Sequence, residues 1–318
     1  MKKIVLIATG VLAAMALTAA PAMSAGHAAA GSAECTGWET DGAGAFDSLA
    51  AITSAASTAR GAAGEGPKEP SLNETYEALP DTAKGKGGPN FRATVPTYIH
   101  VISPDGTTGN VSQRVIDEQM SVLNLAAAGF YGGAKTGFKF SLQGVTRSTN
   151  ASWYNAGAGS FAERELKSTL HQGGWETLNV YTNLAGGYLG YAYLPGLPES
   201  RQYIDGVVLN WESMPGASSR FAGRYDLGHT LTHEVGHWID LDHTFFGGCN
   251  AKGDFVDDTP AMLVPTNGCP IGKDTCEKKP GLDPIHNYMD YSFDTCYNQF
   301  TANQSTRMAS MWTSYRTG

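Results

Sequence analysis

Three histidines and one glutamate within a single short segment constrain this chain more than any other feature. The segment, HEVGHWIDLDH, spans residues 233–243. On a helix, His233 and His237 lie one turn apart on the same face, so both imidazoles can reach one metal ion, and Glu234 projects beside them. The spacing predicts a catalytic zinc site, which keeps one coordination position open for solvent or substrate.

The third histidine of the segment requires the helix to end early. His243 follows His237 by six residues, which on a straight helix would place it on nearly the opposite side. The helix must therefore break near Asp240. Two alternatives are surface histidines that bind no metal and a metal that is only structural. A structural zinc usually has four Cys or His ligands, and no Cys lies close in sequence.

The N-terminal residues predict export. Lys2 and Lys3 precede an apolar run from Ile4 to Ala19, and Pro21 and small residues follow, as in a secretory signal peptide over residues 1–30. No later stretch is long and apolar enough to span a membrane, so we expect no membrane partner. The net charge of -8 and the lack of clustered Lys and Arg argue against nucleic acid as a partner.

The chain has five cysteines, and four of them fall in its last quarter. In an exported protein Cys249, Cys269, Cys276 and Cys296 should form two disulfides, and spacing alone allows three pairings. Cys35 stands apart near the expected mature N-terminus.

Residues 31–90 are rich in Gly, Ala, Ser and Thr and are interpreted as a pro-segment and linker, with one Ala-rich helix near 48–60. Lys84 and Lys86 lie in a Gly-rich stretch that is either an activation site or an ordinary flexible linker. The remaining residues, 91–318, form the predicted catalytic domain.

Hydrophobic periodicity places the elements of that domain. Strands are expected at 94–102, 138–145, 178–182 and 206–211, and helices at 111–127 and 161–170. Asn110 or Ser112 would cap the first helix. Irregular, Gly-rich chain follows the metal helix, so we predict an α+β sheet domain with a loop-rich C-terminal subdomain.

Residues 233–245 resemble the zinc motif of metzincin peptidases, and their surroundings resemble the pappalysin family. Segments in the order typical of that family follow: GGC at 247–249, GDFVDDTP at 253–260, DTC at 274–276 and DPIHNYMDY at 283–291. The resemblance implies a metzincin-like fold with a twisted, mainly mixed sheet, a long backing helix and an active-site helix.

The same resemblance implies roles for the motif residues. The zinc ligands would be His233, His237 and His243. Glu234 would act as general base and acid, and Met289 would form the turn beneath the metal, although Met also packs readily as core filler. Tyr291 would reach the zinc or the oxyanion; the alternative is a buried, hydrogen-bonded tyrosine.

The resemblance also implies a calcium site formed by Asp254, Asp257 and the main-chain carbonyl of Thr259, with Asp258 in the same acidic stretch. The alternative is a solvated acidic loop.

The same resemblance implies a disulfide pairing, in which Cys249 bonds to Cys276 and Cys269 bonds to Cys296. Cys35 would then be an odd thiol that blocks the zinc until the pro-segment is removed; the alternative is an incidental free thiol, or one used between chains.

One position departs from the family pattern. Asp240 stands where the family usually has Gly, at the turn that leads to His243. A left-handed backbone costs a residue with a β-carbon about 1 kcal/mol, although Asp and Asn tolerate it best. If this turn failed, Asp242 would replace His243 as the third ligand, since carboxylate oxygen also binds zinc.

Together these features predict a secreted, monomeric zinc endopeptidase made as a zymogen, which acts on protein or peptide substrates. We expect the substrate to lie extended along an edge strand near residues 205–209. The alternatives are a metal-stabilised binding or adhesion module without turnover and a zinc hydrolase that acts on another bond. The presence of Glu234 argues against the binding module, which needs no base.

Overall fold

Segments rich in β-branched and aromatic residues form one six-stranded sheet in the computed structural model, which describes residues 57–61, 90–250 and 253–317. The strands are β1 (Ser57–Gly61), β2 (Ala93–Ser103), β3 (Phe138–Thr149), β4 (Leu178–Asn183), β5 (Tyr188–Tyr193) and β6 (Val207–Asn210). Their order across the sheet is β1-β5-β6-β4-β2-β3. The pairs β2–β3, β2–β4 and β4–β6 are parallel, whereas β5 is antiparallel to both of its neighbours.

The sheet differs from the sequence-based expectations in three places. Strand β6 lies between β5 and β4, so residues 205–209 do not form an edge to which a substrate could add. The antiparallel strand β5 was not predicted, and it lies nearer the margin of the sheet. Residues 57–60 are extended in β1 rather than helical, because their backbone pairs with β5, and residues 48–56 lie outside the described residues.

Helices account for most of the remaining regular structure. The α-helices are α1 (Gln113–Ala127), α2 (Ala151–Tyr154), α3 (Phe161–Leu170), α4 (His229–Trp238) and α5 (Ala302–Met311). Short 3-10 turns are η1 (Ala185–Gly187), η2 (Glu199–Ile204) and η3 (Trp211–Ser213), and the π-helical turn η4 (Trp312–Arg316) follows α5. The hydroxyl of Ser112, one of the two residues predicted to cap this helix, accepts a hydrogen bond from the amide of Val115 and caps α1.

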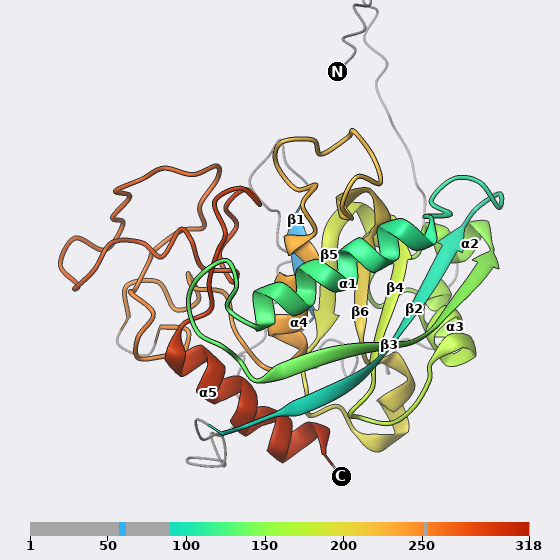
Figure 1. Ribbon diagram of the computed structural model, residues 1–318, viewed down its shortest axis with the longest axis horizontal. Helices are drawn as coiled ribbons and strands as arrows, with labels where there is room; N and C mark the ends of the chain where they lie inside the picture. Colours follow the sequence, from blue (N-terminus) through green and yellow to red (C-terminus); the bar gives the residue numbers. More distant parts are fainter. Residues whose placement is uncertain (1–56, 62–89, 251–252, 318) are drawn as a thin grey trace, which may run out of the picture. The chain divides into compact units, whose positions relative to one another are not determined.

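Two apolar clusters cover the two faces of the sheet. The larger cluster joins the sheet to α1, α4 and the C-terminal helical turns, and it includes Ile116, Val180, Leu231 and Trp238. The smaller cluster joins the opposite face to α3 and includes Leu166 and a group of tyrosines. Figure 1 shows α1 lying across the strands with α4 beside it. Helix α4, which carries His233 and His237, is thus packed against the sheet rather than exposed on the surface.

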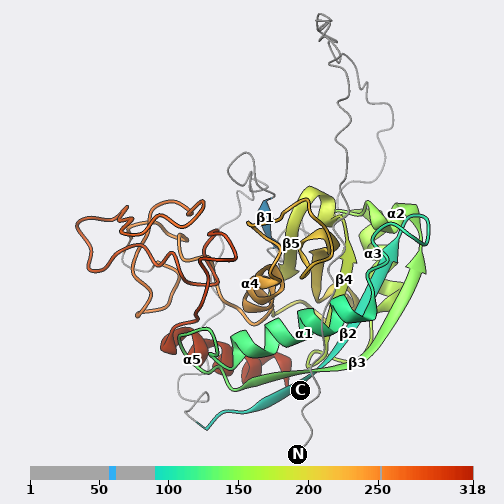
Figure 2. The same cartoon turned by 45° about the horizontal axis from the view of Figure 1, so that its top comes forward.

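The chain between α4 and α5 is mostly irregular. Within its described residues it forms turns and one isolated bridge, between Asn287 and Gln299. Figure 2 shows this orange-to-red segment as a group of loops that leads into α5. The observed architecture confirms the predicted α+β fold with an irregular C-terminal subdomain. No helix in the described part of the chain is long and apolar enough to cross a membrane.

Candidate metal centre and active site

Helix α4 and the turn after it bring three imidazoles together. His233 and His237 lie one turn apart on α4, and His243 follows the turn. Nε2 of His237 lies 3.0 Å from Nε2 of His233 and 3.0 Å from Nε2 of His243. All three side chains are buried. The five residues between His237 and His243 therefore bring His243 back to the side of the helix that carries the other two imidazoles.

Backbone carbonyls fix the tautomers of the two helical histidines. Nδ1 of His233 donates to the carbonyl of Tyr288, and Nδ1 of His237 donates to the carbonyl of Leu241, each at 2.6 Å. A carbonyl only accepts, so in the neutral rings Nε2 carries a lone pair. Burial lowers the pKa of His237 to about 3, which keeps that ring neutral. Two lone pairs that face each other at 3.0 Å repel unless a cation lies between them.

This donor set fits zinc. Tetrahedral bonds of the usual Zn–N length would separate neighbouring nitrogens by about 3.3 Å, close to the observed spacing. Glu234 is fully buried beside the histidines, on the same helix. Asp242 is not part of the cluster: the three ligand atoms that converge belong to histidines. In the other described group with metal-ligand spacing, Cys269, His286 and Cys296, the two sulfurs are already joined in a disulfide.

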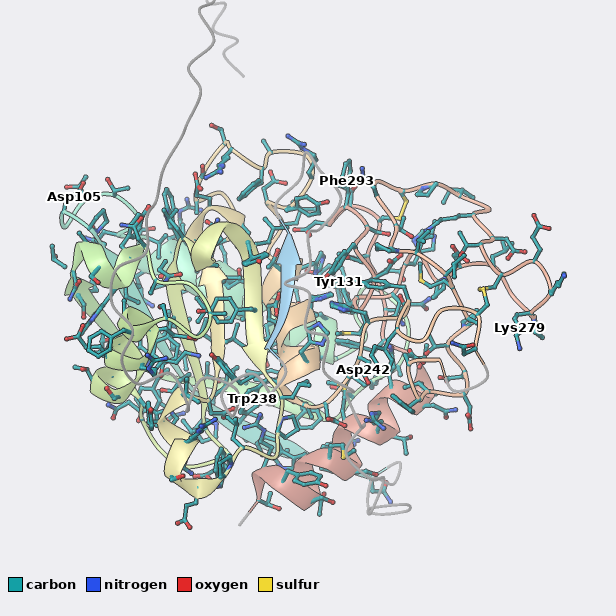
Figure 3. All side chains as sticks on the ribbon, turned by 180° about the vertical axis from the view of Figure 1, so that it is seen from behind. Asp105, Tyr131, Trp238, Asp242, Lys279 and Phe293 are labelled. Atoms are coloured by element: carbon teal, nitrogen blue, oxygen red, sulfur yellow. A yellow bond between two sulfur atoms is a disulfide. The ribbon has the colours of Figure 1, made fainter. Side chains whose placement is uncertain are left out.

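The turn that carries His243 depends on Asp240. This residue has a φ of +73°. The amide of Asp240 donates to the carbonyl of His237, and the amide of Leu241 donates to that of Gly236, which is the hydrogen-bond pattern of a Schellman helix end. Arg307 on α5 holds the residue in place, because its Nε donates to the Asp240 carbonyl at 2.8 Å and its Nη2 to Oδ2 at 2.5 Å. Figure 3 labels Trp238 and Asp242 on either side of this turn.

Met289 lies beneath the metal helix. Its side chain is fully buried, and a β-carbon at Gly236 would collide with its sulfur. Its carbonyl accepts from the amide of Thr244, which ties the turn of the third histidine to the segment below. The ring of Tyr291 packs edge-on against His243, with centroids 4.8 Å apart. Met289 therefore packs beneath α4, and the ring of Tyr291 packs beside the third histidine.

Strand β5 passes directly beside Glu234. An ideal β-carbon on Gly190 would lie 2.9 Å from Cγ and 3.0 Å from Oε1 of Glu234. The backbone of β5 and the carboxylate can therefore approach each other only because residue 190 lacks a side chain. Strand β5 therefore lies directly against Glu234.

The three carboxylates of the acidic stretch after the motif do not share one environment. Asp254 is buried, and burial raises its pKa to about 7, whereas Asp257 is exposed. Asp258 is also exposed, and it accepts a hydrogen bond from the amide of Asn303. Among the described residues no cluster of three His, Cys, Asp or Glu ligand atoms includes Asp254. The buried carboxylate is the strongest feature of this segment that favours a cation.

Two disulfides link the irregular subdomain. Cys249 bonds to Cys276 and Cys269 bonds to Cys296, each with a sequence separation of 27. These are the pairs that the resemblance implies. The carbonyl of Cys296 also accepts a hydrogen bond from Nδ1 of His286 at 2.6 Å. The expected signal peptide, Cys35 and the candidate activation site at Lys84 and Lys86 all lie outside the described residues.

Several residues that shape the site were not singled out as functional from the sequence. They are Gly190, the carbonyl of Tyr288, and Arg307. Asp205 belongs with them: it accepts hydrogen bonds from Nε1 of Trp238 and from Arg316, which also donates to the carbonyl of Trp238. The sequence gives little sign of these contacts, because each joins segments far apart in the chain.

Comparisons with known proteins agree with this geometry. A family model described as pregnancy-associated plasma protein-A matches residues 174–313. An extracellular metalloprotease of Pyricularia oryzae is 44% identical over 230 residues, which cover 71% of this chain and 77% of the relative. An extracellular metalloprotease of Verticillium alfalfae is 42% identical over 79% of this chain and 91% of its own length.

Solved structures show the same fold. Mature mirolysin of Tannerella forsythia, in complex with a cleaved peptide, has a TM-score of 0.60 and 29% identity over 70% of this chain and 93% of that one. A promirolysin mutant from the same organism has a TM-score of 0.61 and 27% identity, over 74% of this chain and 86% of its own.

Proposed function

The chain belongs to the pappalysin family of metzincin metallopeptidases, and we propose that it is a secreted zinc endopeptidase, made as a zymogen, in which Glu234 is the general base and acid. The observation that carries the proposal is the convergence of three imidazole nitrogens, with lone pairs turned toward one another, beside a buried glutamate. Secretion is supported by the N-terminal signal pattern and by the extracellular relatives.

His233, His237 and His243 would hold the zinc. A zinc ion bound by three neutral ligands keeps its positive charge, lowers the pKa of water to about 7 and polarises a carbonyl. The carbonyls of Tyr288 and Leu241 fix the rings that bind it, since each accepts the Nδ1 proton of one histidine.

Glu234 moves the proton. Its carboxylate takes a proton from the attacking water, and the same group then gives that proton to the leaving amine as the peptide C–N bond breaks. Tyr291 would stabilise the oxyanion through its hydroxyl, a role that the packing of its ring against His243 supports. Met289 would support the floor of the site, where it fills the space that Gly236 leaves open.

A calcium ion is proposed at Asp254, with Asp257 and the carbonyl of Thr259 as further ligands. The support is the buried carboxylate of Asp254, whose pKa is raised to about 7 because burial outweighs the hydrogen bond that the amide of Val256 donates to Oδ1. The exposed Asp257 would complete the site from the solvent side.

Two variants test the catalytic assignment. Glu234→Ala should retain one zinc per chain and lose nearly all cleavage of casein, and phenanthroline should abolish the cleavage by the unaltered enzyme. His243→Ala should instead lose zinc. Mass spectrometry of a digested peptide library checks whether peptide bonds are the substrate. Full activity in Glu234→Ala would refute the role of the glutamate, and zinc binding without any hydrolysis of peptides would favour a binding module or another hydrolase.

A further inference from the structure

The disulfide between Cys269 and Cys296 joins two irregular segments of the C-terminal subdomain. One of them, residues 290–296, contains turns and bends but no helix or strand. A backbone hydrogen bond accompanies the disulfide, since the amide of Phe293 donates to the carbonyl of Gly268 at 3.1 Å. Figure 3 labels Phe293, which lies in the middle of this segment. The segment lacks the hydrogen-bond ladder of a helix or sheet, so its position depends on a few such links.

Two residues of the same segment contact the candidate active site. The ring of Tyr291 packs edge-on against His243, with centroids 4.8 Å apart. The buried carboxylate of Asp294 accepts a hydrogen bond from the amide of Leu227, shortly before α4, at 2.9 Å. Because Cys296 follows Asp294 by two residues, opening the disulfide would free the end of the segment that makes these contacts.

The two cysteines of this disulfide have different surroundings. Cys269 is exposed, whereas Cys296 is only 3% exposed. Nδ1 of His286 donates to the carbonyl of Cys296 at 2.6 Å and lies 3.5 Å from its sulfur. Thiol–disulfide exchange is fast where the attacked sulfur is accessible and the leaving thiolate is stabilised. A dissolved thiolate can reach Cys269, and the sulfur that leaves meets an N–H group that stabilises its negative charge.

The other disulfide lacks this combination. Cys249 is half-buried and Cys276 is 4% exposed. The sulfur of Cys249 lies 3.7 Å from the carbonyl oxygen of Thr275, whose partial negative charge would not stabilise a thiolate. Both disulfides have a sequence separation of 27, so the loops that they close are equally long. The bond between Cys249 and Cys276 is therefore a matched internal control for the reactivity of the first.

We propose that the bond between Cys269 and Cys296 is a thiol-sensitive switch, which small thiols open first, with His286 stabilising the departing thiolate, and whose opening lowers peptidase activity. The effect on activity rests on the proposed function. A thiolate attacks Sγ of Cys269, the S–S bond breaks, and the electron pair leaves on Sγ of Cys296. A second thiolate attacks the mixed disulfide and departs as the oxidised thiol dimer, and both cysteines take up protons from solvent. The enzyme would be fully active only in oxidising surroundings, such as those outside the cell.

The first experiment follows both disulfides in the full-length, zinc-loaded chain. The protein is incubated with reduced glutathione, free thiols are trapped with iodoacetamide over time, and the labelled peptides are identified by mass spectrometry. Cys269 and Cys296 should be labelled about tenfold faster than Cys249 and Cys276. Equal rates, or earlier labelling of Cys249 and Cys276, would overturn the proposal.

Two variants test the contribution of the imidazole. His286→Leu removes the N–H group and should slow the opening of the bond between Cys269 and Cys296 about tenfold. His286→Asn keeps a donor near the position of Nδ1 and should stay within about threefold of the parent rate. The bond between Cys249 and Cys276 reports any general loosening of the subdomain, because its rate should be the same in all three proteins. An unchanged rate in His286→Leu would overturn the role of the imidazole.

Casein digestion measures the effect on activity. With the bond between Cys269 and Cys296 open and the other disulfide closed, kcat should fall about tenfold or more at one zinc per chain, because Tyr291 loses its fixed position. Oxidised glutathione should restore the activity. Unchanged kcat in this state, or activity that is lost only as zinc is lost, would overturn the switch and leave the peptidase function standing. A chain that digests no casein in either redox state would overturn both.

Discussion

Replacing Arg307 by Met should destabilise the turn that carries His243. Arg307 donates to both the carbonyl and the carboxylate of Asp240, at 2.8 and 2.5 Å, and the two side chains are 9% and 0% exposed. The substitution would leave the Asp240 carboxylate buried without its cation. Removing one partner of a buried ion pair costs about 3–5 kcal/mol.

A second variant removes both the buried carboxylate and the backbone strain at residue 240. Asp240→Gly in the Arg307→Met background removes the unpaired carboxylate and also relieves about 1 kcal/mol of left-handed strain at φ +73°. The double variant should therefore recover most of the lost stability. Arg114→Met is the matched control, because its pair with Glu118 is 66% and 44% exposed, and exposed pairs contribute less than about 1 kcal/mol.

Urea denaturation and competition with a zinc chelator measure both effects. Arg307→Met should unfold at lower urea and bind zinc more weakly, since the same turn supplies His243 and the carbonyl of Leu241 that orients His237. An Arg307→Met protein that is as stable as the Arg114→Met control would refute the reasoning. So would a double variant as unstable as the single one.

Three further predictions follow from the site. Gly190→Val should place a side chain against Glu234 and lower kcat about 100-fold with zinc content unchanged, as measured by casein digestion and metal analysis; unchanged kcat would contradict the contact. Because the folded-state pKa of Asp254 is raised to about 7, folding favours the protonated carboxyl, so the metal-free protein should lose stability as the pH rises from 4 to 7. Calcium should restore that stability at pH 8 and have little effect at pH 5 in thermal unfolding, and Asp254→Asn should abolish both dependences. Met289→Ala should leave a cavity under Gly236 and cost about 2–5 kcal/mol in urea denaturation, and a cost below about 1 kcal/mol would argue against tight packing there.

Most of the regular elements follow from local sequence. The helix at Phe161–Leu170 has the predicted bounds, and α1 begins after its predicted cap at Ser112. Strand β5 was not predicted, because its sequence, YLGYAY, lacks a clear alternation and is buried along almost its whole length. Strand β1 was mistaken for a helix because Ala-rich sequence has high helix propensity, which pairing with β5 overrides.

The candidate zinc ligands could be predicted from the sequence alone, because ligand type and helical spacing are local properties: His233 and His237 share one helix face, with Glu234 beside them, wherever that helix lies. The sequence also required a break near Asp240. How the site is completed depends on the folded chain, since Arg307, Gly190 and the carbonyl that orients His233 come from segments tens of residues away. Strand order is likewise a property of the folded chain. Backbone groups pair without regard to side-chain identity, so no local pattern reveals that β5 is the strand beside Glu234.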